Sequence, residues 1–211
     1  MALSWLVCHT PYRLLMAIGH VLGNLYYLLV KKERERAVSQ MMRSLELPEA
    51  EARRTVRASF FNLAKNVLEI LYMPHLNESN FEQYIEIDHL ERMKAALAEG
   101  KGVVVLTGHI GTWEWLSASF TLNGLPVTAI AKPQPNIQYT QVLDDLRATI
   151  HVEIFSRGTS ELLAAARALK SGKILGFLAD QDAGPGGCFT EFLGRTASTP
   201  MTTLCLPFGW R

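Results

Sequence analysis

The feature that most constrains the fold of this chain is an alternation of short apolar runs with longer helical segments, which begins after Lys101. Strands that alternate with helices of about ten to fifteen residues are joined by crossover connections, which produce a mostly parallel sheet. The sequence therefore predicts an α/β fold with a mostly parallel central sheet flanked by helices. The expected strands are residues 103–106, 127–131, 152–155 and 174–178, and the expected helices are residues 112–122, 136–150 and 160–170.

Two polar side chains directly follow expected strands. His109 comes after the first strand and Asp180 after the fourth. In open parallel sheets, ligands bind beyond the carboxyl ends of the strands. We therefore expect both residues at one edge of the sheet, in the functional site.

His109 and Glu114 are the candidate catalytic pair. On a regular helix, residues five apart point roughly 140° away from each other, so two mid-helix side chains at this spacing could not meet. If His109 lies in the turn and the helix begins near Thr112, the ring can fold back so that Glu114 holds one imidazole nitrogen. The other nitrogen then faces a substrate proton. Gly108 and Gly111 allow the turn and the close approach of a substrate, although a lone His is also common as a structural residue.

The loop after the fourth strand, residues 180–187, is polar and rich in glycine. Asp180 and Asp182 can stabilise a turn through their side chains, or one of them can contact a sugar hydroxyl or orient Arg147. The loop lacks the full ligand set of a calcium loop, so we expect no metal. Arg147 falls near the end of the expected helix 136–150, where a cation is favourable for dipole reasons alone.

Residues 11–30 form an apolar segment in which only Arg13 is charged. Its length could span a bilayer, but two glycines, a His and an Asn make it a poor spanning helix. No Lys or Arg lies in residues 2–10, which argues against a cleavable signal peptide. A spanning helix, a helix lying in the interface and a buried amphipathic helix all remain open. The charged cluster 31–36 favours the cytoplasmic side for that end.

The distribution of charge favours a membrane surface over a nucleic acid as the binding partner. The 21 Lys and Arg nearly balance the 20 Asp and Glu, so we expect no nucleic-acid partner. Residues 1–60, however, carry nine Lys and Arg against five Glu, which suits an anionic membrane or a solvated helix face of mixed charge. The three cysteines have neither disulfide nor metal-ligand spacing, and we expect them to be reduced thiols. They are Cys8, Cys188 and Cys205.

Residues 48–72 predict a second helix with one apolar stripe, which we interpret as core packing. The stripe consists of Val56, Phe60, Leu63, Val67 and Ile70. The alternative is that aromatic side chains line a groove for an apolar ligand. The candidates for that groove are Phe60, Phe61, Trp113, Trp115 and Phe120.

From about Trp5 to Thr199 the chain resembles the late acyltransferases of bacterial lipid A biosynthesis, within the glycerolipid acyltransferase superfamily. The superfamily carries a His followed five residues later by an acid, which is Glu in the lipid A branch, as at Glu114. Residues 178–185 are similar to the family's Asp-Gln-Asp segment. Residues 191–199 are similar to its Phe-Phe-Gly-x-x-Ala-x-Thr segment, with Leu in place of the second Phe.

The resemblance implies acyl transfer from a thioester donor, acyl carrier protein, to a hydroxyl of a lipid A precursor or related glycolipid, with no cofactor. It assigns His109 and Glu114 to catalysis, and it matches Asn136 and Arg147 to an Asn and an Arg of the family. We expect substrate contacts from Arg147, Asp180, Asp182, Asn136 and Gly111. The implied location is the inner membrane, with the catalytic domain on the cytoplasmic side.

The expected organisation is a membrane-associated helix with its basic flank in residues 1–36 and the acyltransferase α/β domain in residues 37–211. Family members continue beyond the Ala-x-Thr segment, so we expect this domain to be C-terminally incomplete, with an unpaired sheet edge. An acyltransferase for another glycolipid or a lysophospholipid remains an alternative, as does a non-catalytic membrane-associated binding module. No Gly-x-Ser-x-Gly elbow supports an α/β hydrolase.

Overall fold

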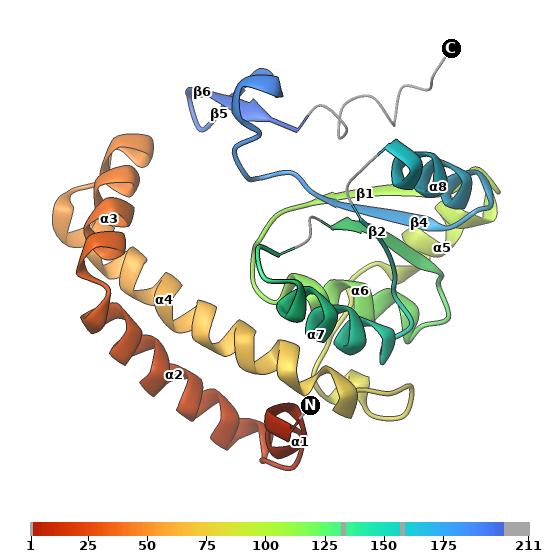
Figure 1. The fold of residues 1–211 in the computed structure, drawn as a ribbon, viewed down its shortest axis with the longest axis horizontal. Coiled ribbons are helices and arrows are strands. Elements are labelled where there is room, and N and C mark those ends of the chain that lie inside the picture. Colours follow the sequence, from red (N-terminus) through yellow and green to blue (C-terminus); the bar gives the residue numbers. More distant parts are fainter. Residues whose placement is uncertain (1, 132–133, 157–158, 201–211) are drawn as a thin grey trace.

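The computed structural model describes residues 2–131, 134–156 and 159–200. It contains a layered α/β unit, beside which lies a pair of long helices (Figure 1). The sheet strands are β1 (Val103–Thr107), β2 (Val127–Ala131), β3 (Glu153–Ser156) and β4 (Ile174–Leu178). All pair in parallel, in the spatial order β1-β4-β2-β3. The predicted α/β class is confirmed, and the bounds of the four predicted strands are correct to within one residue.

Helices cover both faces of this sheet. Helices α6 (Trp113–Thr121) and α7 (Ile137–Ala148) lie on one face and α8 (Thr159–Lys170) on the other (Figure 1). Neighbouring residues of β4 separate accordingly: Ile174 joins the core cluster of the first face, whereas Leu175 packs in the cluster near α8. Such alternation follows from the two-residue period of a strand, and because both faces of β4 are covered, the strand is apolar throughout.

The N-terminal part of the chain forms the helical pair. Helix α2 (Tyr12–Leu29) packs along α4 (Glu49–Tyr72), and glycines make the close contact possible. A Cβ added to Gly23 would lie 2.6 Å from the Cα atom of Phe61, and one added to Gly19 would lie 2.9 Å from Cγ of Lys65. These two positions, four residues apart on α2, therefore let the two backbones approach closely.

The outer face of α2 is apolar and exposed, as is that of α1 (Ala2–Cys8). Among the described residues no single helix meets the length and hydropathy expected of a membrane span; α2 and α3 (Lys31–Leu45) meet it only together, with a bend of 92° between them. Helix α3 runs through the boundary predicted after residue 36, and that boundary stays a prediction. The exposed apolar side chains of α1 and α2 are Leu3, Trp5, Leu6, Leu14, Ile18, Val21, Leu22, Leu25, Tyr26, Leu28 and Leu29.

The predicted core stripe of α4 is only partly correct. Val56 is buried, but Leu63 and Val67 are 44% and 50% exposed. The described neighbours of α4 meet the face that carries Leu68 and Tyr72, and this leaves the Leu63–Val67 side of the helix accessible.

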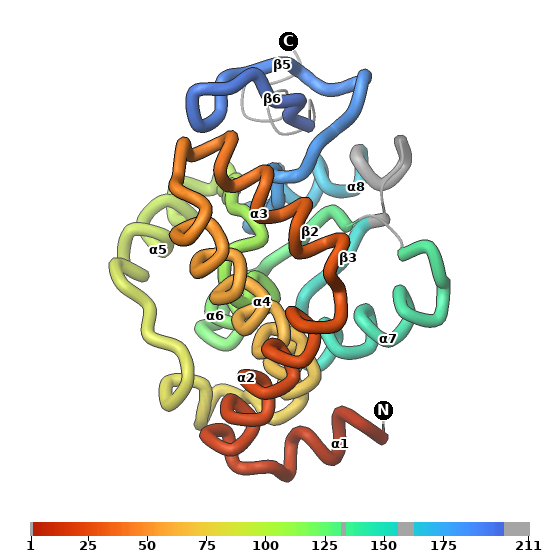
Figure 2. The backbone as a smooth tube through the Cα atoms, turned by 90° about the vertical axis from the view of Figure 1, so that its left-hand side faces the viewer, coloured from red at the N-terminus to blue at the C-terminus, as the bar shows by residue number. Residues whose placement is uncertain are grey.

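The remaining elements surround this frame. Helix α5 (Leu90–Ala98) precedes β1, and short 3₁₀ helices occupy Met73–His75, Phe81–Gln83 and Gly184–Gly186. An antiparallel hairpin, β5 (Cys188–Phe192) and β6 (Arg195–Thr199), follows the sheet. Figure 2 shows the hairpin next to the end of α3, where the Arg195 guanidinium donates to the carbonyl of Arg43 at 3.2 Å.

We expect Gly23→Ala to lower the free energy of unfolding, because the new methyl group would meet backbone atoms of Phe60 and Phe61 that no rotamer change can move. Overpacking of this kind costs about 1–3 kcal/mol, against which Ala gains up to about 1 kcal/mol in helix propensity. Urea denaturation measures the net loss. The matched control is Gly186→Ala, where a Cβ meets nothing within 4 Å; an equal effect in both variants would contradict the packing argument.

Candidate active site

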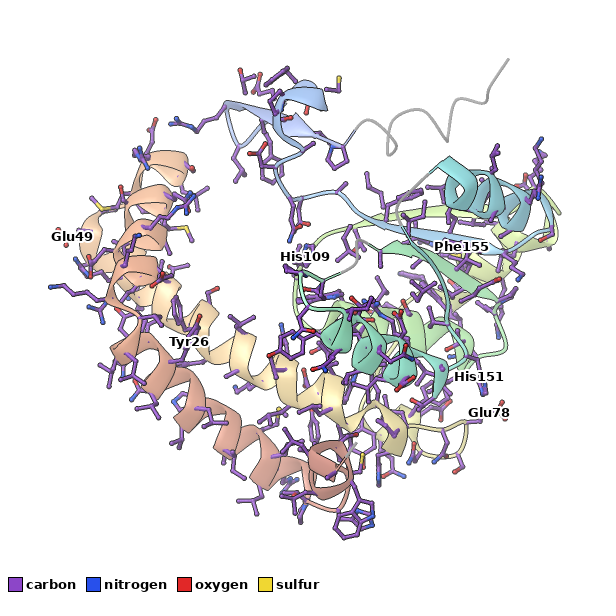
Figure 3. All side chains as sticks on the ribbon, in the orientation of Figure 1. Tyr26, Glu49, Glu78, His109, His151 and Phe155 are labelled. Carbon is purple, nitrogen blue, oxygen red and sulfur yellow. The ribbon has the colours of Figure 1, made fainter. Side chains whose placement is uncertain are left out.

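The candidate site is built where two neighbouring parallel strands end. Thr107 at the end of β1 pairs with Leu178 at the end of β4. His109 and Asp180 each come two residues later and so lie side by side, at the edge of the sheet where the sequence predicts both. Nδ1 of His109 is 2.7 Å from Oδ1 of Asp180, and the His109 backbone N–H donates to Oδ2 at 2.6 Å. In Figure 3, His109 lies at the side of the α/β unit that faces α3 and α4, whereas His151 lies on the far side.

These contacts fix the tautomer of a neutral imidazole ring. Because a carboxylate only accepts hydrogen bonds, Nδ1 carries the proton that Asp180 accepts, and Nε2 of the neutral ring keeps a lone pair. The nearest described polar neighbour of Nε2 is the side-chain nitrogen of Gln181, at 3.4 Å. Partial burial acts to raise the pKa of Asp180, but the hydrogen bonds from the His109 side chain and backbone outweigh it and hold that pKa below its ordinary value.

Glycine is required next to this pair. A Cβ added to Gly108 would lie 2.9 Å from Oδ2 of Asp180 and 3.1 Å from its Cγ. Any larger residue would push the carboxylate away from His109. Gly111 has a positive φ of +57°, a conformation that side chains with a Cβ rarely adopt.

Glu114 does not make the contact with His109 that the sequence spacing suggested. It is 6% exposed, and its carboxylate accepts two hydrogen bonds from Arg147, from Nε at 2.9 Å and from Nη2 at 2.6 Å. Helix α6 begins at Trp113 with Thr112 as its N-cap, close to the predicted start, but Glu114 in its first turn points to Arg147 of α7. Burial acts to lower the pKa of Arg147, but Glu114, and then Asp144 at 3.2 Å, raise it overall.

Helix α4 anchors the segment between β1 and α6, which the sequence analysis did not anticipate. The Asn66 side chain donates to the carbonyl of Gly111 at 2.7 Å and accepts from the Thr112 hydroxyl at 3.1 Å. The Thr112 hydroxyl also contacts the carboxylate of Glu69, and that carboxylate accepts from the Tyr12 hydroxyl at 2.6 Å. The available signal for this contact was the presence of polar residues on a face of α4 that also carries buried apolar residues. Asn66 is one of them, and it is only 8% exposed.

The start of α6 offers free donors. Among the described residues, the backbone N–H groups of Gly111, Thr112 and Trp113 have no hydrogen-bond partner. Unpaired N–H groups at a helix start attract negative charge. The Trp113 ring packs edge-on against the His109 ring, with centroids 4.7 Å apart.

The other predicted site residues have local partners. Oδ1 of Asp182 accepts from the backbone of Gly184 at 2.9 Å, and Oδ1 of Asn136 caps α7 by accepting from Gln138 at 2.9 Å. Their predicted substrate contacts stay predictions. The sequence also offers two secondary basic candidates for the site, Lys132 and Arg157, and both lie outside the described residues.

Of the proposed aromatic groove residues, Trp115 and Phe120 belong to the hydrophobic core, being 7% and 8% exposed. They are therefore not free to line a groove. Phe60 packs against Tyr26 and Tyr27, and Phe61 packs against His20. This leaves Trp113, next to His109, as the aromatic candidate nearest the site.

A strand-end His bonded to a carboxylate, with free amide donors at the adjacent helix start, defines a site suited to acid–base chemistry on an acyl group. The comparisons with known proteins identify the class: the chain belongs to the bacterial lipid A biosynthesis acyltransferase family, which it matches over residues 1–206.

Among the proteins it is similar to is the lipid A biosynthesis lauroyltransferase of Escherichia coli (strain K12), with 24% identity over 185 residues. The aligned region covers 86% of this chain and 58% of the lauroyltransferase, so the chain spans little more than half the length of that relative.

The Glu114–Arg147 pair predicts a measurable stability effect. Arg147→Met leaves a buried carboxylate without its partner, which costs about 3–5 kcal/mol. Urea denaturation should show this loss, and the double variant Glu114→Gln/Arg147→Met should recover most of it, because both charges are then removed. A loss below about 1 kcal/mol in Arg147→Met would mean that solvent screens the pair as it does at a surface.

Proposed function

We propose that this chain transfers a fatty acyl group from a thioester donor to a hydroxyl of a lipid A precursor or a related glycolipid. The observation that carries the proposal is the His109–Asp180 hydrogen bond at the carboxyl edge of the sheet. It leaves Nε2 as a base, on the side of the sheet that faces α3 and α4. Family membership supports the same reaction class.

In the proposed mechanism, Nε2 of neutral His109 removes the proton of the acceptor hydroxyl while its oxygen attacks the thioester carbonyl. Asp180 orients the ring and stabilises the imidazolium that forms. The C–S bond then breaks, the imidazolium returns the proton to the leaving thiolate, and the products are an ester and a free thiol. The free N–H groups at the start of α6 stabilise the oxyanion of the tetrahedral intermediate. This route needs no protein nucleophile.

Glu114 has a different part in this scheme from the one its spacing suggested. In the proposal it acts as a positioning residue, whose buried carboxylate holds Arg147 by two hydrogen bonds. The Arg147 side chain remains 14% exposed. A guanidinium is well shaped to bind a substrate phosphate or a thioester carbonyl, and we assign Arg147 that contact.

Exposed apolar residues around the site suit a lipid substrate. Ile110, next to His109, is 83% exposed, and Leu106 of β1 is 62% exposed. On α4, Leu63 and Val67 flank Asn66, which holds Gly111. We propose that these side chains contact the acyl chain. Acyl carrier protein is the proposed donor, since it is an acidic partner and the N-terminal region carries excess positive charge.

We further propose that α1 and α2 attach the chain to the cytoplasmic side of the inner membrane. The exposed apolar residues of α2 recur at positions such as Leu14, Ile18, Val21, Leu25 and Leu28, which form one continuous stripe. A contiguous apolar face of this kind marks an interaction site.

Acyl transfer from a labelled acyl carrier protein to a panel of glycolipids tests the mechanism. We expect His109→Ala to lose a factor of about 10²–10⁴ in rate while it keeps the parent's melting temperature. Asp180→Asn should lower kcat more than KM, because the ring then loses its orientation. A folded His109→Ala protein with parental activity would exclude this mechanism.

A comparison of two carboxylates separates the proposed roles. If Asp180 orients His109 as described, Asp180→Asn should cost more in kcat than Glu114→Gln, whose main effect should be on KM and on stability. The reverse order would mean that Glu114 contacts the imidazole in the reacting complex, as its sequence spacing first suggested.

Membrane attachment is tested by cosedimentation with vesicles of phosphatidylcholine and phosphatidylglycerol. We expect Val21→Asp combined with Leu28→Asp to abolish most binding, since both side chains lie on the exposed stripe. The control is Leu163→Asp on α8, also exposed, which should bind as the parent does. Equal binding by all three proteins would exclude α2 as the attachment surface.

A further inference from the structure

A basic hollow lies away from the His109 site, at the end of α2. It has a volume of about 480 Å³ and lies between the last turn of α2 and the first half of α4. Its lining contains three arginines and no acidic residue. The lining residues are Tyr27, Arg53, Arg54, Arg57, Ala58 and Phe61.

The three arginines differ in how far their charge is already balanced. Arg53 is fully engaged, because Glu35 accepts two hydrogen bonds from it at 3.0 and 2.8 Å and Glu49 accepts a third at 2.8 Å. The hydrogen bonds from Arg53, and after them those from Arg34, lower the pKa of Glu35 to about 2. Arg53 therefore contributes to the wall of the hollow, with its charge already balanced by two carboxylates.

Arg54 and Arg57 keep unused donors. The Arg54 side chain is 80% exposed, and its nearest described carboxylate, Glu51, is 4.0 Å away. Arg57 donates to the amide oxygen of Asn24 at 2.7 Å, a neutral partner, and no described carboxylate pairs with it. Three residues apart on α4, the two guanidinium groups lie on one helix face. Together they present two cations to the same volume.

Aromatic rings hold Arg57 in place. Its guanidinium carbon lies 5.4 Å from the centre of the Phe61 ring and 6.0 Å from that of Tyr27. Stacking of this kind restricts the side chain without using its hydrogen-bond donors. A preorganised guanidinium with free donors is the group best suited to grip a phosphate with two parallel hydrogen bonds.

The hollow and the candidate active site lie on different faces of α4. Arg57 and Asn66 are nine residues apart on α4, or two and a half turns, so they are separated by about 13.5 Å along the helix axis and point to opposite sides of it. Asn66 in turn bonds the Gly111 carbonyl, two residues from His109. A phosphate bound in the hollow is therefore a contact separate from those proposed for the His109 site.

We propose that this hollow binds the phosphate group of a lipid-linked sugar phosphate through Arg54 and Arg57, at a position separate from the His109 site. This inference rests on the proposed function for its ligand class. The exposed apolar face of α2 supports the choice of a lipid-linked ligand, because a helix adsorbed by that face places its end at the level of the headgroups.

The test measures binding without acyl transfer, so that its result does not depend on catalysis. Glucose 1-phosphate and glucose are titrated into the whole chain and followed by NMR. We expect binding of the phosphate ester only, and a loss of about tenfold or more in affinity in Arg54→Gln/Arg57→Gln, since two charge-assisted contacts disappear. The matched control, Arg92→Gln/Lys94→Gln on α5, removes the same charge and should bind as the parent does.

The outcomes are distinct. No binding of glucose 1-phosphate by the parent, or equal weakening in both double variants, would overturn the proposal, since general charge would then explain the result. Should Arg54→Gln/Arg57→Gln fail to fold, the single variant Arg54→Gln replaces it, because that side chain is largely exposed. His109→Ala should bind the sugar phosphate as the parent does. The binding result is therefore independent of whether the catalytic proposal is correct.

A second arm separates the lipid-linked sugar phosphate from ordinary anionic phospholipid. Vesicles of phosphatidylcholine with and without phosphatidylglycerol are compared. If the hollow is specific for a sugar phosphate, Arg54→Gln/Arg57→Gln and the α5 control should bind phosphatidylglycerol vesicles equally. A selective loss of vesicle binding in the first variant, with glucose 1-phosphate binding unchanged, would assign the hollow to bulk headgroups and overturn the proposal.

Discussion

The pairing of β1 with β4 is the interaction on which the candidate site depends. These strands are adjacent in the sheet but about seventy residues apart in the chain, and their register makes them end together. Because His109 and Asp180 follow the two ends by the same number of residues, the register brings imidazole and carboxylate into contact. A change of register would separate them, since one residue corresponds to about 3.3 Å along a strand.

Helix α4 connects the two parts of the molecule. Its first half meets α2 and α3 and lines the basic hollow, and its second half bonds the segment that carries His109 through Asn66 and Glu69. Glu69 also accepts from Tyr12 at the start of α2, and the surrounding burial, together with that hydrogen bond, raises the Tyr12 pKa above its ordinary value. The helix proposed to meet the membrane and the proposed catalytic segment are thus held by one rigid element.

The two acidic residues considered for His109 differ in their surroundings. Asp180 is partly exposed beside the ring, whereas Glu114 is buried and its two oxygens are occupied by Arg147. A buried ion pair is costly to break, because each charge would lose its partner without regaining water. This is the physical reason to assign orientation of the ring to Asp180 and a positioning role to Glu114, although the spacing of five residues is the more visible feature of the sequence.

Local patterns predict the α/β class, the order of strands and helices after Lys101, and the placement of His109 and Asp180 at one sheet edge. They can do so because apolar periodicity and strand-end position are properties of short segments. The contact partners of these side chains could not be predicted in this way. Which carboxylate meets His109, which residues of α4 hold its loop, and that Leu63 and Val67 stay exposed depend on the packing of segments distant in the chain. Periodicity says that a face is apolar, and only the tertiary structure decides what covers it.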